Sequence, residues 1–279
     1  MLRSAENPGE IAGTLIGSSA AALELREETE LAARFNGRVM ISGEYGVGKQ
    51  RLAKLIHRQS VRCDAPFIAI ACANAPEAQL EIQLFGGRNN AGALERADSG
   101  IVFLEDVDAL SPALQARLMR SLATGDIQPV GRQTIRRRVN GRIVCATTAR
   151  LFDKIATGHF RQDLYYLLNT IYIPVPPLRE RTEDVEPLLD FFTAYYARRY
   201  GLVVPQLSLE SRASCRACDW PANLRQLQAA AAIFVLPTRP LPPAQILESA
   251  ARIALYNRLP SVRNGQLAGH DRPCAGQQS

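Results

Sequence analysis

The sequence has few lysines, no long hydrophobic run and no signal-peptide core, and the last two features exclude classes of protein. Lysine occurs only at Lys49, Lys54 and Lys154, although lysine and arginine together number 33. No hydrophobic run approaches the roughly 18 residues that a membrane-spanning helix needs. The opening residues (MLRSAENPGE) also lack the hydrophobic segment of a signal peptide. We therefore expect a cytoplasmic protein that does not bind a membrane.

The six cysteines do not form a recognisable metal or redox motif. Cys215 and Cys218 form a CxxC pair, but a zinc site needs further ligands, and the sequence has no second CxxC and no HxxxH. A redox CxxC would need a thioredoxin-like context, which is missing. Cys72 and Cys145 lie in hydrophobic, strand-like runs. We expect these cysteines to pack as small hydrophobic residues.

The remaining composition is that of a globular protein. Of 279 residues, 47% are hydrophobic and 22% are charged, which excludes disordered, collagen-like and coiled-coil classes. This length allows one large domain or two modest ones. The net charge of +6 permits an anionic partner but does not require one.

Short hydrophobic runs alternate with helical spacing over the first two thirds of the chain. Strands are predicted at residues 38–42, 67–72, 100–104, 142–147 and 171–175, and helices at residues 50–60 and 111–122. Runs that are hydrophobic throughout are typical of strands buried on both faces. The sequence therefore predicts an α/β fold whose parallel sheet is covered by helices on both sides.

The pattern changes near residues 176–181 (PPLRER), after which only helices are predicted. These helices lie at about residues 185–199, 209–218, 223–236 and 243–258. From residue 259 the sequence is rich in Gly, Pro and Gln and is expected to be a frayed tail. We therefore predict an α/β domain at residues 1–181, a small helical domain at 182–258 and a tail at 259–279.

A glycine-rich segment between the first predicted strand and the next helix has the context of a phosphate-binding loop. Glycines let successive backbone amides surround phosphate oxygens, and the helix N-terminus favours their negative charge. Lys49 would add a point charge at the β- and γ-phosphates. Gln50 stands where a Ser or Thr usually binds magnesium; its amide oxygen could bind the metal or a metal-bound water. The predicted ATP-binding residues are Gly43, Glu44, Tyr45, Gly46, Val47, Gly48, Lys49 and Gln50.

Two acids, Glu105 and Asp106, follow the third predicted strand. Carboxylates at the end of a strand beside a phosphate loop are typical of a Walker B site, where one acid holds hydrated Mg²⁺ and the other orients the attacking water. We predict that Glu105 and Gln50 bind the metal. The usual order is Asp then Glu, so the second acid here is shorter by one methylene. Displacing the carboxylate that orients the water by a small distance can lower the rate by a large factor. With Glu before Asp, the sequence therefore does not decide whether the bound ATP is hydrolysed.

In combination, these motifs resemble the AAA+ module of bacterial enhancer-binding proteins, the ATPases that activate sigma-54 RNA polymerase. The resemblance covers about residues 15–255. The matching segments are IGSS (16–19), GEYGVGK (43–49), LIHRQS (55–60), LFG (84–86), VFLED (102–106), GHFRQDLYYLLN (158–169), VPPLRERTEDV (175–185) and WPANLRQL (220–227).

The resemblance implies a fold, a function and further site residues. The fold would be a three-layer P-loop AAA+ sandwich followed by an all-helical lid. The function would be ATP-dependent regulation of transcription through assembly or remodelling of a hexameric ring. Arg161 resembles an arginine finger that reaches a neighbour's nucleotide, and Arg225 resembles the lid arginine that senses the γ-phosphate. Thr148 stands at the position of the family's sensor asparagine.

Four departures from the family pattern keep a second interpretation open. Leu167 replaces a second arginine, Ala71 replaces the asparagine that restrains the catalytic acid, and Thr148 replaces the sensor asparagine. The sigma-54-contacting loop with its GAFTGA signature is absent, because only residues 87–91 separate LFG from Gly92. The alternative is a non-hydrolysing module for which ATP is a ligand that favours assembly with another regulator.

Five arginines cluster before the fourth predicted strand, and two interpretations of them stay open. They could form a positive surface for nucleic acid or an acidic partner, or they could flank a solvated hairpin. No aromatic residues are interleaved for base stacking, so DNA binding by this chain is not expected. The arginines are Arg132, Arg136, Arg137, Arg138 and Arg142.

Overall fold

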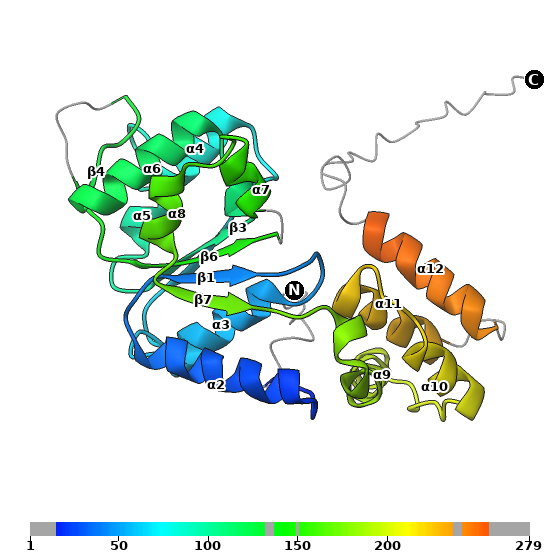
Figure 1. Ribbon diagram of the computed structural model, residues 1–279. Helices are drawn as coiled ribbons and strands as arrows, with labels where there is room; N and C mark the ends of the chain where they lie inside the picture. Colours follow the sequence, from blue (N-terminus) through cyan, green and yellow to red (C-terminus); the bar gives the residue numbers. More distant parts are fainter. Residues whose placement is uncertain (1–14, 132–136, 149–150, 237–241, 257–279) are drawn as a thin grey trace, which may run out of the picture.

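The computed structural model describes residues 15–131, 137–148, 151–236 and 242–256, which form an α/β unit and a smaller helical unit (Figure 1). Within these residues, no helix is both long and apolar enough to cross a membrane. The predicted tail at 259–279, together with Arg132 and Arg136, lies outside the described residues.

Five parallel strands form the central sheet, in the order β2-β3-β6-β1-β7. They are β1 (Val39–Ser42), β2 (Phe67–Ala71), β3 (Ile101–Glu105), β6 (Arg142–Thr147) and β7 (Ile171–Pro174). Strand β1 lies between β6 and β7, and Val39 pairs with Val144 on one side and with Ile171 on the other. The predicted parallel sheet is confirmed. Its order reverses around β1, and ligands of such sheets bind at the carboxyl ends of the strands near this reversal.

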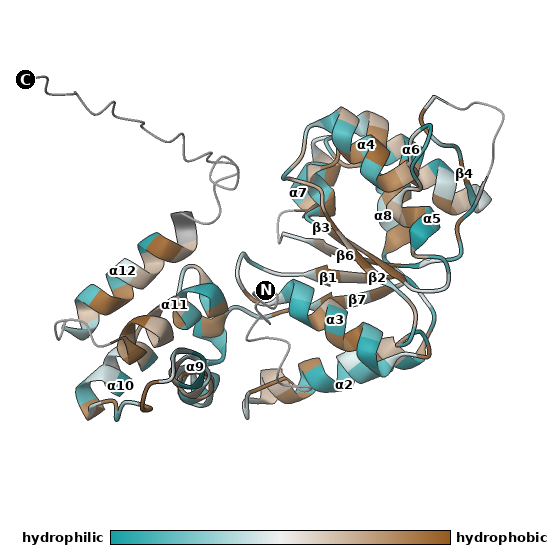
Figure 2. Cartoon of the chain, turned by 180° about the vertical axis from the view of Figure 1, so that it is seen from behind, coloured by the Kyte–Doolittle hydropathy of each residue, from teal (hydrophilic) through white to brown (hydrophobic). Residues whose placement is uncertain are grey.

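Helices cover both faces of the sheet, which confirms the three-layer architecture (Figure 1). Helices α2 (Ala20–Arg34) and α3 (Lys49–Gln59) cover one face; α4 (Glu77–Phe85), α5 (Ala93–Arg96), α6 (Pro112–Thr124), α7 (Leu151–Ala156) and α8 (Gln162–Leu168) cover the other. Successive side chains of a strand enter opposite layers: Met40 packs in the core under α4–α8 and Ile41 in the core under α2 and α3. Figure 2 shows the hydrophobic strands between these layers.

The helical unit consists of α9 (Val185–Tyr200), α10 (Leu209–Arg216), α11 (Asn223–Val235) and α12 (Pro243–Tyr256). Its core surrounds Trp220, whose indole N–H donates to the Cys215 carbonyl oxygen at 3.0 Å. Cys215 is buried in this core, as expected of a packing residue, and burial raises the pKa of its thiol to about 11. The division of the chain after Arg181 stays a prediction.

The arginine-rich segment includes part of a hairpin, in which β4 (Asp126–Ile127) pairs with β5 (Arg137–Arg138) in antiparallel register. Neither of the two interpretations of the arginine cluster, a positive surface or a solvated hairpin, holds for Arg142. Its side chain is buried, and its guanidinium donates to the Gly37 oxygen at 2.7 Å and the Ala32 oxygen at 2.6 Å. Burial lowers the pKa of Arg142 to about 10. The side chain therefore ties β6 to the end of α2.

Replacing Arg142 with methionine is expected to destabilise the fold by about 2–4 kcal/mol, because one buried and one partly buried carbonyl oxygen lose a charged donor. Equilibrium urea denaturation measures this free energy. The control is Arg138→Ala, whose side chain is exposed and whose loss should change stability by less than about 0.5 kcal/mol. Equal effects of the two changes would contradict a structural role for Arg142.

Candidate functional site

The predicted phosphate loop connects the end of β1 to the start of α3. Gly46 and Gly48 have φ of +80° and +103°, a region that glycine enters at no steric cost. Helix α3 begins at Lys49, so its first backbone amides, which have no partner within the helix, lie at the loop. Lys49 is largely buried. Its Nζ donates to the backbone carbonyl oxygens of Gly43, at 2.7 Å, and Glu44, at 3.0 Å.

The helical unit packs directly on this loop. The buried Asn223 side chain donates to the Tyr45 oxygen at 2.9 Å and accepts from the Leu178 amide at 2.7 Å. Arg179 forms two hydrogen bonds with the Glu44 carboxylate, at 2.6 and 2.8 Å. These bonds from Arg179 hold the pKa of Glu44 below its usual value. Leu178 and Arg179 belong to the hinge, the segment 175–184 between β7 and the helical unit. The helical unit and this hinge therefore fix the shape of the loop.

A pocket between the two units brings together most of the predicted site residues. It is lined by Tyr45, Gly46, Val47, Gly48, Lys49, Gln50, Arg51, Glu105, Asp106, Leu224, Arg225 and Gln228. Amides and a lysine suit phosphate oxygens, and adjacent carboxylates suit Mg²⁺. Arg225 reaches the pocket from α11, where its guanidinium donates to the Tyr45 hydroxyl and lies 5.3 Å from the centroid of that ring. The donor set therefore fits a magnesium-bound nucleotide.

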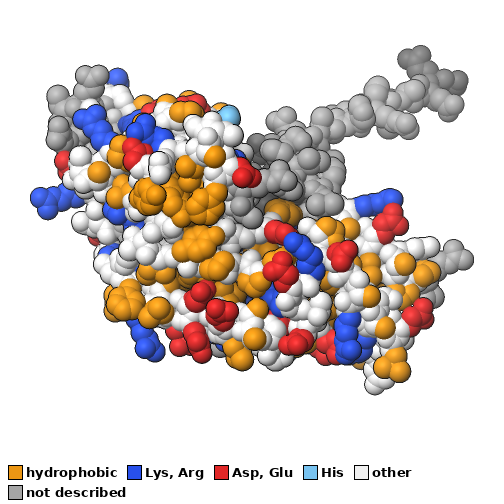
Figure 3. Space-filling view, viewed as in Figure 1, with side chains coloured by type: hydrophobic (Ala, Val, Ile, Leu, Met, Phe, Trp, Pro, Cys, Tyr) orange, Lys and Arg blue, Asp and Glu red, His pale blue; other side chains and the backbone are white. Residues whose placement is uncertain are grey.

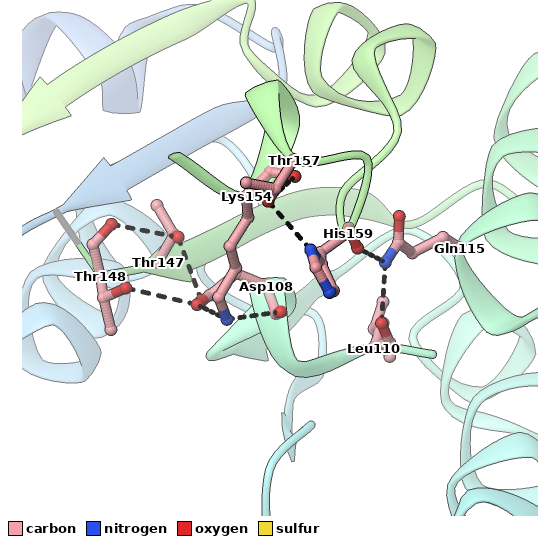
Figure 4. A network of polar contacts seen from close by, with 8 residues as sticks. All are labelled: Asp108, Leu110, Gln115, Thr147, Thr148, Lys154, Thr157 and His159. Atoms are coloured by element: carbon pink, nitrogen blue, oxygen red, sulfur yellow. Dashed lines mark hydrogen bonds and ion pairs between the residues drawn. The ribbon is translucent and has the colours of Figure 1, made fainter. Parts of the chain in front are cut away.

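Thr148 makes its contact with a residue that the sequence analysis did not single out. Its hydroxyl donates to Asp108 at 3.3 Å, and Thr147 donates to the other carboxylate oxygen of Asp108 at 3.0 Å (Figure 4). Lys154 donates to Asp108 at 2.7 Å. Burial by itself would raise the pKa of Asp108, but the hydrogen bonds from Lys154 and Thr147 and the charge of Lys154 outweigh it, so the pKa is lowered. The only signal in the sequence was a further acid close behind Glu105 and Asp106.

Arg161 does not line the pocket of its own chain. It is the N-cap residue of α8, and its exposed side chain pairs with Asp163 through two hydrogen bonds of 2.6 and 3.0 Å. Its backbone amide donates to the buried Gln115 side chain at 2.9 Å. Within one chain, then, the structure gathers residues 45–50 of the loop, the two acids and Arg225 around the pocket. Of the other predicted site residues, Gly43, Glu44, Thr148 and Arg161 do not line it.

Family comparisons agree with this architecture. The model of the sigma-54 interaction domain matches residues 15–174, and that of the AAA+ ATPase lid domain matches residues 179–240. A nitric oxide reductase transcription regulator, NorR2 of Cupriavidus necator, is 40% identical over 79% of this chain and 44% of that protein. A Nif-specific regulatory protein of Azotobacter vinelandii is 38% identical over 77% of this chain and 42% of its own length.

Solved structures agree as well. NtrX from Brucella abortus in complex with ADP superposes with a TM-score of 0.76 at 32% identity, over 89% of this chain and 64% of that one. The complex of NtrX with ATP gives a TM-score of 0.75 at 32% identity, over 88% and 63% of the two chains. The chain spans less than half the length of the curated relatives named above. It belongs to the family of AAA+ sigma-54 interaction domains found in bacterial transcription regulators.

Proposed function

We propose that this chain binds ATP with Mg²⁺ in the pocket between its two units and that nucleotide drives its assembly as a transcription regulator. The observation that carries the proposal is the convergence of Lys49, Glu105, Asp106 and Arg225 on one pocket. The complexes of the similar NtrX with ADP and ATP support nucleotide as the ligand. Such a regulator would act in the cytoplasm.

Each residue has a role that follows from its chemistry and place. The loop amides and Lys49 would hold the phosphates, and Glu105 and Gln50 would hold the metal. Asp106 would orient the attacking water, since this residue lines the same pocket. Arg225 would leave Tyr45 and bind the γ-phosphate from the lid, because a phosphate offers its guanidinium a stronger, charged acceptor than a phenol does.

Arg161 would act on the nucleotide of a neighbouring subunit. Its guanidinium is exposed and lies outside its own pocket, while its backbone is held by Gln115. An arginine supplied in trans can neutralise charge on the transferring phosphoryl group. This placement supports a homo-oligomer, for which family likeness suggests a hexameric ring.

The partner is proposed to be another regulator or a part of the transcription machinery that does not need a long sigma-54 loop. Residues 86–92 join α4 directly to α5 in a tight turn. Within it the Gly87 amide donates to the Asn90 oxygen at 2.9 Å, and the Gly86 oxygen accepts from Val130 at 2.9 Å. These contacts favour a short, hydrogen-bonded turn over a long loop, although residues 88–90 at its tip are exposed.

A second candidate function is nucleotide binding without turnover. Thr148, at the sensor position, is tied to Asp108 instead of lining the pocket, and the short Asp106 follows Glu105 where the reverse order is usual. ATP would then act as a ligand that stabilises the assembled state.

Two measurements on the purified chain separate the two functions. A phosphate-release assay measures ATP hydrolysis, and size-exclusion chromatography with and without ATP measures assembly. We expect turnover that Asp106→Ala lowers at least about 100-fold, because the attacking water loses its orienting carboxylate. ATP binding and nucleotide-dependent assembly without phosphate release would establish the second function instead. Calorimetry that detects no binding of ATP or ADP would contradict both.

A further inference from the structure

A polar network lies between the segment that follows β3 and the segment that precedes Arg161, and Figure 4 shows its side chains, Asp108 and Lys154 among them. Its centre is Asp108, which lies in the short helix η1 (Val107–Ala109) immediately after Glu105 and Asp106. Asp108 is 7% exposed, and both of its carboxylate oxygens accept hydrogen bonds. The groups that donate to it come from the end of β6 and from α7.

One side of the network reaches the phosphate loop. The Thr147 hydroxyl donates to Asp108 at 3.0 Å, and the carbonyl oxygen of Thr147 accepts from the Gly43 amide at 3.3 Å. Thr147 pairs with Ser42 in the sheet, so the first loop glycine and Asp108 are joined through a single buried residue. A shift of the loop when a phosphate binds would therefore be felt at Asp108.

The other side of the network reaches the backbone next to Arg161. Lys154 donates to the carboxylate of Asp108 at 2.7 Å and to its carbonyl oxygen at 2.9 Å. The Lys154 carbonyl oxygen accepts from the amide of the buried Phe160 at 3.0 Å. Lys154 thus joins η1 to the residue immediately before Arg161.

A second route from η1 ends at the same place. The Gln115 side chain is fully buried, and its amide nitrogen donates to the Leu110 oxygen at 2.8 Å and the His159 oxygen at 2.9 Å. Its carbonyl oxygen accepts from the Arg161 amide at 2.9 Å. The backbone on the N-terminal side of Arg161 is therefore held from two directions, while the guanidinium itself is exposed.

We propose that Asp108 and Lys154 are a positioning pair that couples the nucleotide pocket to the placement of Arg161. Neither residue lines the pocket; the pair would fix the base from which Arg161 extends toward a neighbouring subunit. This inference rests on the proposed function. It explains why a buried carboxylate that accepts three side-chain hydrogen bonds follows two acids that already line the pocket.

Steady-state ATP hydrolysis by the full chain and its variants tests the pair. Asp108→Asn and Lys154→Met are expected to lower kcat about tenfold while KM stays within about twofold, because misplacing a catalytic group slows the reaction without removing ground-state binding. Lys154→Arg keeps the charge and should retain most of kcat. Unchanged kcat in the two disruptive variants would overturn the proposal.

A matched control separates positioning from general stability. Arg142→Met removes a buried polar side chain at the start of β6, the end of the strand opposite Thr147. It should lower the thermal midpoint by a comparable amount, because buried hydrogen bonds are lost in both cases, but leave kcat unchanged. A fall in kcat that merely follows the thermal midpoint in all variants, Arg142→Met included, would show a structural role only and overturn the proposal.

Hydrogen exchange with a non-hydrolysable ATP analogue gives a readout that does not need turnover. In the wild-type chain the analogue should slow exchange in the peptide covering residues 154–161; in Asp108→Asn that protection should disappear while protection of the phosphate loop remains. Absence of protection at 154–161 in a wild-type chain that binds the analogue would overturn the coupling. Absence of any nucleotide binding would instead overturn the proposed function itself.

Discussion

Replacing Lys49 with alanine is expected to weaken ATP binding about 100-fold and to remove phosphate release. Lys49 lies at the first turn of α3, and its ammonium is held by the oxygens of Gly43 and Glu44, at the centre of the loop. When ATP binds, its charged phosphate oxygens would replace these neutral carbonyl oxygens as acceptors of the Lys49 ammonium. A charge-assisted hydrogen bond of this kind contributes about 1.5–3 kcal/mol. A loss of about 2.7 kcal/mol corresponds to this factor in affinity.

Lys54→Ala is the matched control for this change. Lys54 lies on the same helix but does not line the pocket, so both variants lose one positive charge and differ only in where they lose it. Calorimetry with ADP and ATP in magnesium buffer should show wild-type affinity, within about twofold, for Lys54→Ala. A folded Lys49→Ala variant that binds ATP as tightly as the wild-type chain would show that the nucleotide lies elsewhere.

The elements that position this lysine could be predicted because their signals are local. Strand β6 coincides with the predicted residues 142–147, and α6 begins at Pro112 after Ser111, whose side chain caps the helix as its sequence indicates. Hydrophobic runs buried on both sides predicted the parallel sheet, and the glycine spacing predicted the loop. Each of these features depends on residues that are adjacent in sequence.

Features that depend on distant residues were missed or misjudged. Arg142 was grouped with neighbouring arginines by sequence proximity, yet its acceptors belong to Ala32 and Gly37, more than a hundred residues earlier. The bond between Asp108 and Lys154 likewise spans 46 residues. Charge alone does not show whether such a side chain is solvated or paired, because burial is decided by tertiary packing.

Helix α2 was missed for a different reason. Ser19 caps it and accepts from the Ala22 amide, so a start signal was present in the sequence. The IGSS segment before it drew attention as a family motif instead. The structure shows what this segment does: Asp184 accepts from the amides of Ser18 and Ser19, at 2.8 and 2.9 Å. Asp184 thereby joins the start of α2 to the hinge that leads into the helical unit.

Replacing Gly46 with alanine is expected to destabilise the fold strongly, because this glycine lies where the phosphate loop meets the helical unit, called the lid below. A Cβ at Gly46 would lie 2.2 Å from the Ala222 carbonyl oxygen, a backbone atom that cannot turn away. The residue also has φ of +80°. A left-handed backbone costs a non-glycine residue about 1–2 kcal/mol, and the overlap should bring the total to at least about 3 kcal/mol.

Gly125→Ala separates the cost of the left-handed backbone from the cost of the steric overlap. Gly125 has a similar φ of +74°, but an added Cβ would have nothing within 4 Å, so this variant shows the backbone cost alone. The single tryptophan, Trp220, lies buried in the lid core, so its fluorescence during urea unfolding reports on the lid. Far-UV circular dichroism reports on the whole chain. A loss of about 1–2 kcal/mol in Gly125→Ala and a clearly larger one in Gly46→Ala would measure the close approach of loop and lid.

The two signals also show how the molecule relieves the overlap in Gly46→Ala. If the lid moves off the loop, the Asn223 bond to Tyr45 breaks, and tryptophan fluorescence should change at lower urea than circular dichroism does. Nucleotide affinity should then fall as well, because Arg225 leaves the pocket together with α11. Equal stability of Gly46→Ala and Gly125→Ala would mean that the lid does not rest on the phosphate loop in solution.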